Sequence, residues 1–300
     1  MSRKHVWIAI LCNTIWGLAS LYWYRLAHID ALLVLYSRII FAAVLAYGMV
    51  LATRKRGELK AKITDRKTMK YMIPAALIIS FNWGMYIWAM GHGHMIDASL
   101  GYFMAPLMVF AVSVGFFGEK AGKLQLAAMF IALTGVLVSI AMYRTVPVIG
   151  LVLGFSFTVY GTIKKKVKVY PAVSIFIESI VLTPFALVLM ALTMRPEIKA
   201  LAPVDFPLLM GTGVLTAVPL VLYASAVNNI PYITLGFTQY ISPAITVLVG
   251  LFYGEMFTPE KKVLLGFILA SLALYSYAGI RDVRRLKEEV RDVPSTADRS

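Results

Sequence analysis

Apolar residues occur along this chain in long runs that short polar segments separate. A run of about 17 to 25 mostly apolar residues has the length that a helix needs to cross the hydrocarbon core of a bilayer. Such a run must be helical in lipid, because an unpaired backbone amide costs several kcal/mol there. The pattern therefore predicts an all-α membrane protein with ten transmembrane helices. The predicted spans are 5–23, 31–53, 71–91, 97–117, 122–142, 147–163, 171–193, 206–227, 232–253 and 260–280.

Lysine and arginine are distributed unevenly between the two sides of the membrane that these spans imply. With a cytoplasmic N-terminus, 22 of the 29 Lys and Arg residues fall on the cytoplasmic side, many of them in segments 54–70 and 164–168. Six fall on the opposite side, and Arg38 lies within a span. Cytoplasmic loops carry the excess of Lys and Arg in membrane proteins. We therefore expect a multi-pass protein with both termini in the cytoplasm and the lipid bilayer as its surroundings.

The composition agrees with a membrane protein and changes the interpretation of the charge. Hydrophobic residues make up 60% of the chain, charged residues only 15%, and the mean hydropathy is +0.77, whereas soluble domains carry roughly 25% charge. The net charge of +14 would suggest a nucleic-acid partner if it formed one basic patch. Because the basic residues lie between apolar runs, we expect no nucleic-acid partner. Cys12 is the only cysteine, which excludes a disulfide or a cysteine-based metal site within the chain.

The sequence contains an internal repeat, which is the sign of a repeated architecture. A shift of 135 residues aligns Leu100-Gly101-Tyr102 with Leu235-Gly236-Phe237 without a gap. Each copy holds five spans, so the second copy enters the membrane from the opposite side, as in inverted-repeat transporters. We predict two inverted five-helix repeats, over 1–143 and 144–281, and a basic cytoplasmic tail over 282–300.

Several short motifs distributed over nearly the whole chain resemble a known family. They are Trp16-Gly17, Asn82-Trp83, Ser99-Leu100-Gly101-Tyr102-Phe103, Gly118-Glu119, Tyr160-Gly161-Thr162-Ile163-Lys164-Lys165, Gln239-Tyr240-Ile241-Ser242-Pro243 and Gly254-Glu255. Together they resemble the RarD-like branch of the EamA domain, within the drug/metabolite transporter superfamily. The resemblance implies EamA-type repeats, a bacterial-type cytoplasmic membrane, and secondary transport or export of a small metabolite or an amphipathic drug-like molecule. It names no substrate, and we expect no cofactor or bound metal.

Two ionisable residues lie well inside the predicted spans, where each costs at least about 2.5–3.5 kcal/mol. Arg38 is the eighth residue of the second span, and Glu178 is the eighth of the seventh. Because these spans are inverted equivalents, the two residues lie at mirrored depths, roughly 12 Å apart along the membrane normal. They could bind opposite ends of a zwitterionic substrate, form a gating pair, or snorkel separately. Glu178 is also a candidate to bind a coupling proton.

Aromatic and amide side chains at the predicted interface of the halves complete a candidate substrate site. Rings would cover the apolar part of an amphipathic metabolite, and amides would fix its orientation. These residues are Trp16, Asn82, Trp83, Tyr86, Tyr102, Tyr160, Tyr223, Gln239 and Tyr240. Trp7, Trp23 and Tyr24 lie near span ends, where aromatic side chains mark the membrane interface.

Two other functions remain as alternatives. A structural or partner-binding membrane protein would show the same pattern of spans, because a fold alone does not define a function. An enzyme is suggested only by His92 and Asp97, whose spacing is that of some acyltransferases. No phosphate-binding block accompanies this pair, so we expect a transporter and not an enzyme.

Overall fold

We describe a computed structural model that covers residues 3–91, 95–144, 146, 148–253 and 258–291. The described residues form α-helices joined by short turns, and no strand occurs among them. The long helices are α1 (Arg3–Arg25), α2 (Ala31–Ala52), α4 (Arg66–Gly91), α5 (Met95–Gly115), α6 (Lys123–Tyr143), α7 (Val148–Lys166), α8 (Pro171–Thr193), α10 (Asp205–Val227) and α13 (Pro259–Arg291). The shorter ones are α3 (Arg56–Thr64), α9 (Arg195–Ala200), α11 (Tyr232–Gln239) and α12 (Ile241–Phe252).

Every apolar run that the sequence predicted as a span is helical in the described part of the chain. Eight helical segments there are long and apolar enough to cross a membrane, counting α11 and α12 together, and a shorter apolar helix covers Gly101–Gly115 within α5. The protein is therefore an all-helical, multi-pass membrane protein. Helix α13 contains the last predicted span and continues without a break to Arg291.

Local polar groups determine where several helices begin and end. The Asp30 carboxylate accepts hydrogen bonds from the backbone N–H groups of Leu32 (2.8 Å) and Leu33 (3.2 Å), which fixes the start of α2. Asp65 caps α4 in the same way, and its hydrogen bond from the Thr68 hydroxyl lowers the pKa of the Asp65 carboxyl. Arg144 adopts a left-handed conformation (φ 54°) that ends α6.

The run predicted as one span over 232–253 is two helices that meet at Tyr240. Pro243 accounts for this break. Its nitrogen has no hydrogen to donate to the carbonyl of Gln239, four residues earlier, and its ring crowds that carbonyl. Gln239, the last residue of α11, therefore lies at a discontinuity in the helix.

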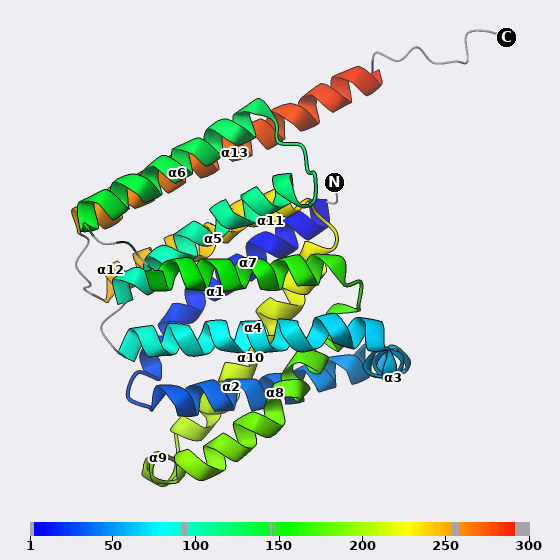
Figure 1. The fold of residues 1–300 in the computed structure, drawn as a ribbon, viewed down its shortest axis with the longest axis vertical. Helices are drawn as coiled ribbons and strands as arrows, with labels where there is room; N and C mark the ends of the chain where they lie inside the picture. Colours follow the sequence, from blue (N-terminus) through cyan, green and yellow to red (C-terminus); the bar gives the residue numbers. More distant parts are fainter. Residues whose placement is uncertain (1–2, 92–94, 145, 147, 254–257, 292–300) are drawn as a thin grey trace, which may run out of the picture. The chain divides into compact units, whose positions relative to one another are not determined.

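The chain forms two compact units. The smaller one consists of α6 and α13, which lie side by side (Figure 1). In it, the Ser271 hydroxyl donates to the backbone carbonyl of Ala128 at 2.7 Å, and Gly135 leaves space for the side chain of Phe267. Helices α6 and α13 belong to different predicted repeats. The two compact units therefore do not coincide with the two predicted repeats.

The larger unit contains the other helices and packs them closely through glycine. A Cβ atom on Gly101 of α5 would lie 2.5 Å from the carbonyl oxygen of Gly150 on α7. A Cβ atom on Gly17 of α1 would lie 2.6 Å from Cβ of Ile245 on α12. Small residues allow such close approach between helices in membranes.

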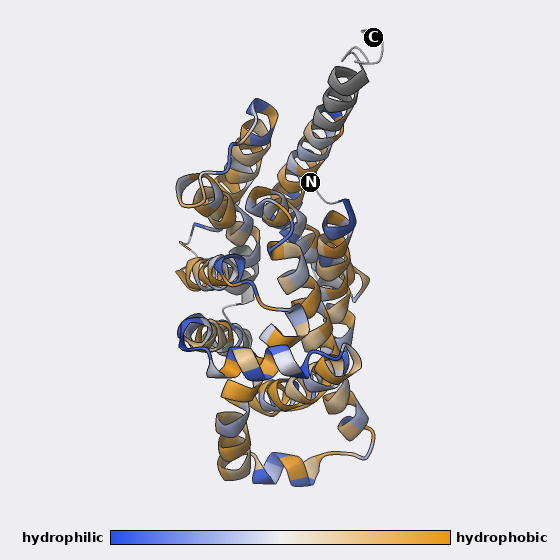
Figure 2. Ribbon diagram, turned by 90° about the vertical axis from the view of Figure 1, so that its right-hand side faces the viewer, coloured by the Kyte–Doolittle hydropathy of each residue, from blue (hydrophilic) through white to orange (hydrophobic). Residues whose placement is uncertain are grey.

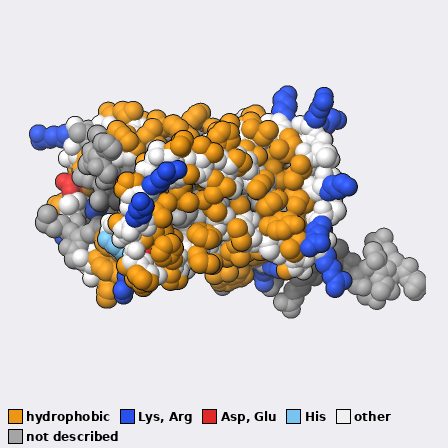
Figure 3. Space-filling model, turned by 90° about the horizontal axis from the view of Figure 1, so that it is seen from below, with side chains coloured by type: hydrophobic (Ala, Val, Ile, Leu, Met, Phe, Trp, Pro, Cys, Tyr) orange, Lys and Arg blue, Asp and Glu red, His pale blue; other side chains and the backbone are white. Residues whose placement is uncertain are grey.

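Hydrophobic residues cover most of each helix, and hydrophilic residues gather at helix ends and turns (Figure 2). The face in Figure 3 shows a broad band of hydrophobic side chains with Lys and Arg toward its two ends. Large side chains in such positions are strongly exposed, including Phe185 (66%) and Leu192 (71%) on α8. This exposure is expected where lipid, not water, is the solvent.

Candidate functional site

A cavity of about 230 Å³ lies within the larger unit. Its lining residues come from α1, α2, α4, α5, α7, α10, α11 and α12. Seven residues that the sequence singled out line it, namely Trp16, Arg38, Asn82, Trp83, Tyr86, Tyr102 and Gln239. Spans that are far apart in the sequence thus contribute to one site.

Arg38 is the one charged residue among those that line the cavity in the described part of the chain. Its Nε donates to the Thr216 hydroxyl oxygen at 3.2 Å, and that hydroxyl in turn donates to the carbonyl of Thr212. The guanidinium carbon lies 4.3 Å from the ring centroid of Trp83 and 5.2 Å from that of Trp23. The two rings partly compensate the buried charge through cation–π attraction.

The amides in the cavity differ in what they bind. The Asn82 side-chain nitrogen donates to the Leu153 carbonyl (2.8 Å) and to the Ser156 hydroxyl (2.9 Å), so it links α4 to α7. Gln239 is only 6% exposed, and neither its amide oxygen nor its amide nitrogen meets a described residue in hydrogen-bonding geometry. Both amide atoms of Gln239 are enclosed by protein beside the Tyr223 hydroxyl, and neither is open to the cavity.

The other predicted site residues do not line the cavity. Tyr160, Tyr223 and Tyr240 are at most 1% exposed and pack in the core. The ring of cavity-lining Trp16 contacts Tyr223 (centroids 5.8 Å apart), and Tyr223 stacks on Tyr160 at 6.2 Å. Tyr223 and Tyr160 thus lie behind the cavity wall, whereas the ring of Tyr240 contacts Phe237.

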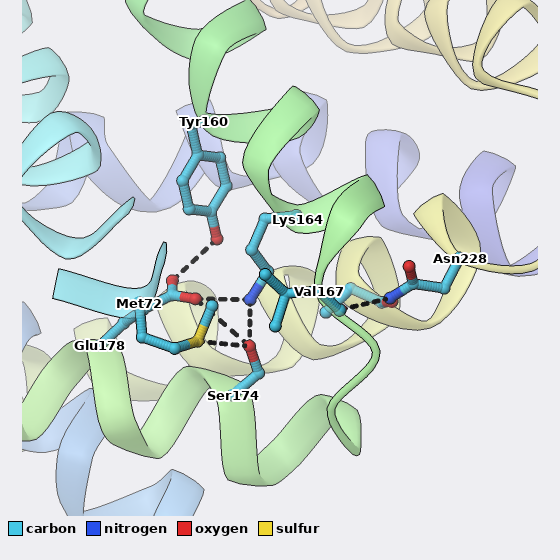
Figure 4. Close-up of polar contacts among 8 residues, drawn as sticks. Met72, Tyr160, Lys164, Val167, Ser174, Glu178 and Asn228 are labelled. Atoms are coloured by element: carbon cyan, nitrogen blue, oxygen red, sulfur yellow. Dashed lines mark hydrogen bonds and ion pairs between the residues drawn. The ribbon is translucent and has the colours of Figure 1, made fainter. Parts of the chain in front are cut away.

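Glu178 lies in a buried polar cluster with Tyr160, Lys164 and Ser174 (Figure 4). Its Oε1 lies 2.5 Å from Nζ of Lys164, and its Oε2 accepts a hydrogen bond from the Tyr160 hydroxyl at 2.9 Å. Ser174 contacts both charged groups. Arg38 instead bonds to Thr216. A direct ion pair between Arg38 and Glu178, one of the alternatives that the sequence left open, is therefore not formed in this structure.

Lys164 is the main residue that sequence reasoning missed. It was counted only among the Lys and Arg residues of the cytoplasmic side, because it follows the predicted end of the sixth span at 163, and in the structure it is 2% exposed. The isolated carboxylate of Glu178 was the available signal, because an acid inside a membrane needs a partner. Trp23 was likewise expected at the membrane interface but lines the cavity.

A second carboxylate links two helices at their ends. Glu119 accepts hydrogen bonds from the backbone N–H groups of Tyr232 (2.7 Å) and Ile233 (2.8 Å) at the start of α11. It also lies 3.4 Å from Nζ of Lys165 at the end of α7. Its repeat counterpart Glu255, and the His92 and Asp97 side chains of the enzyme alternative, lie outside the described residues.

Comparisons with known proteins agree with this architecture. Residues 3–141 and residues 145–277 each match the EamA-like transporter family. An uncharacterized transporter, YojE of Bacillus subtilis, is 35% identical over 95% of this chain and 98% of its own length. Protein RarD of Escherichia coli is 32% identical over 95% of this chain and 97% of its own.

This chain also resembles a more distant relative and a solved structure. A chloramphenicol-sensitive protein RarD of Pseudomonas aeruginosa is 26% identical over 87% of this chain and 89% of its own length. A solved crystal structure superposes with a TM-score of 0.72 over 91% of this chain and 97% of that chain. Its sequence identity is 12%, so it supports the fold alone.

Proposed function

The chain belongs to the EamA-like transporter family, and on this premise we propose that it is a secondary active transporter that exports a small metabolite by alternating access. The observation that carries the proposal is the cavity around Arg38. A partly buried cation and a set of aromatic rings converge there. Such a combination is typical of a ligand site.

Helix contacts within the larger unit support an inverted-repeat architecture. Helix α1 packs against α10 and α12, and α7 packs against α4 and α5. Helix α2 packs against α10, and α8 against α4. If α1, α2, α4 and α5 correspond to α7, α8, α10 and α11–α12, each contact in the first set has its counterpart in the second. The cavity is then lined by both halves, where inverted-repeat transporters place their substrate.

The orientation belongs to the same proposal. We place ten spans in the cytoplasmic membrane with both termini inside the cell, on the strength of the bias in Lys and Arg. If the buried Lys164 is left out of the count, most Lys and Arg residues still fall on the cytoplasmic side.

The size of the cavity favours a metabolite over a drug-sized molecule. Pockets for drug-sized ligands span about 300–1,000 Å³, and this one holds about 230 Å³. We leave Glu178 out of the substrate site, because its carboxylate is taken up by Lys164, Tyr160 and Ser174. Its role as a coupling-proton site stays a separate proposal.

An untargeted comparison of extracellular metabolites tests the function. Cells that overexpress the protein should release at least one small metabolite faster than cells with an empty vector. Thr246 lines the cavity, and Thr246→Trp should abolish the difference. Leu248 lies on the same helix, is 58% exposed and does not line the cavity, so Leu248→Trp is the matched control. A protein that changes no metabolite but retains a specific membrane partner would instead have the structural role.

A further inference from the structure

The charge of the cavity restricts what it can bind. Among the described residues that line it, Arg38 is cationic and none is an aspartate or glutamate. Glu178, the buried acid of α8, is already paired with Lys164. An unoccupied cavity thus holds one positive charge in a membrane protein, where an uncompensated charge is costly.

The guanidinium of Arg38 retains hydrogen-bond donors for a ligand. A guanidinium has five N–H groups, and only the one on Nε has a partner among the described residues, Thr216. The rings of Trp83 and Trp23 attract the charge but do not take up the terminal N–H groups in conventional hydrogen bonds. Two parallel N–H groups of this kind match the two oxygens of a carboxylate.

From these observations we infer that the cavity binds small organic anions: an apolar body that carries a carboxylate, with Arg38 as its counter-charge. The rings of Trp16, Trp83 and Phe157 line the apolar part. This inference rests on the proposed transport function and specifies its substrate class.

A zwitterion fits the cavity less well than an anion. Its ammonium group would find no carboxylate among the described lining residues. The rings of Trp23 and Trp83, which could otherwise attract a cation, already contact Arg38. An ammonium placed near these rings would be repelled by the guanidinium, and more strongly in a low-dielectric site than in water.

Binding to the purified full-length protein in lipid nanodiscs tests this inference. Four probes share one ring and differ in charge: 3-phenylpropionate, its neutral amide, phenylalanine and phenethylamine. Quenching of tryptophan fluorescence would report binding, because Trp16, Trp23 and Trp83 line the cavity. The anion should bind about tenfold more tightly than the neutral amide, and the amine should bind most weakly.

Variants separate recognition from folding. Arg38→Lys keeps the charge but loses the planar fork, and should weaken binding of 3-phenylpropionate about tenfold. Arg195 on α9, outside the cavity, is the matched control, and Arg195→Lys should change nothing.

Several results would overturn the inference: equal affinity for the anion and the amide, tighter binding of the amine, no binding of any probe, or full affinity in Arg38→Lys. Failure of the transport proposal would look different. In that case the anion binds with the expected dependence on Arg38, but vesicles containing the protein show no flux of any metabolite. Conversely, export of only cationic or neutral metabolites would contradict the anion inference and leave the transport proposal intact.

Discussion

Nζ of Lys164 lies 2.5 Å from Oε1 of Glu178, with only 2% and 4% of the two side chains exposed. Glu178→Gln keeps the shape of the side chain but leaves the Lys164 ammonium without its counter-charge. Breaking a buried ion pair in this way costs about 3–5 kcal/mol. We expect the variant to lose membrane abundance and thermal stability in detergent, measured by blotting and by a fluorescence melt.

The second partner provides the control for this experiment. Glu178→Gln combined with Lys164→Met removes both charges and should recover most of the lost stability. A single Glu178→Gln variant as stable as the wild type would contradict the pairing. If the double variant is stable, its flux between pH 5 and 8 shows whether Glu178 also carries a coupling proton.

Tyr160→Phe should destabilise the same cluster through a different group. The Tyr160 hydroxyl donates to Oε2 of Glu178 at 2.9 Å, and a hydrogen bond to a charged group contributes about 1.5–3 kcal/mol. Tyr240 is equally buried, but its hydroxyl has no partner among the described residues. Tyr240→Phe should therefore be neutral or stabilising. Equal melting temperatures for the two variants would show that the Tyr160 hydroxyl contributes nothing.

Gly101→Ala should weaken the packing of α5 against α7. The added Cβ would lie 2.5 Å from the Gly150 carbonyl oxygen, and backbone cannot move aside as a side-chain tip can. Overpacking of this kind costs about 1–3 kcal/mol. Gly48 of α2 has open space around it, so Gly48→Ala should instead gain up to about 1 kcal/mol from helix propensity. Thermal melts of both variants measure these changes in stability. A Gly101→Ala variant as stable as the wild type would contradict the close approach of α5 to α7.

The proposed topology predicts where fused reporters lie. Reporters after residues 60, 166 and 285 should read as cytoplasmic, and reporters after residues 145 and 200 as external, because Lys and Arg concentrate on the cytoplasmic side. Paired phosphatase and fluorescent-protein fusions measure this. A cytoplasmic signal at residue 145 would mean an even number of spans before it and would exclude two inverted five-helix halves.

The helices were predictable because a long apolar run in lipid must satisfy its own backbone hydrogen bonds, and a helix does so. The position of the break at Tyr240 did not follow from the presence of Pro243 alone, because proline inside a membrane helix does not always end the helix. In this structure Pro106, Pro184 and Pro219 lie within continuous helices. The outcome at each proline depends on whether neighbouring groups satisfy the freed carbonyl.

The candidate site was predictable in kind but not in its partners. Depth along a helix follows from counting residues, so the sequence predicted Arg38 and Glu178 as charges inside their spans. Which neighbour each one faces depends on how the helices are rotated and arranged laterally, and one sequence does not give that. Lys164 shows the limit most clearly, because its long side chain extends from a helix end into the core.

The break between α11 and α12 gives the cavity a mechanical property. Gln239 ends α11, Ser242 lies in the first turn of α12, and both line the cavity on either side of a missing backbone hydrogen bond. A helix that lacks one backbone hydrogen bond bends at lower cost there than elsewhere. A ligand bound against both segments therefore affects the angle between α11 and α12 when it binds and when it leaves.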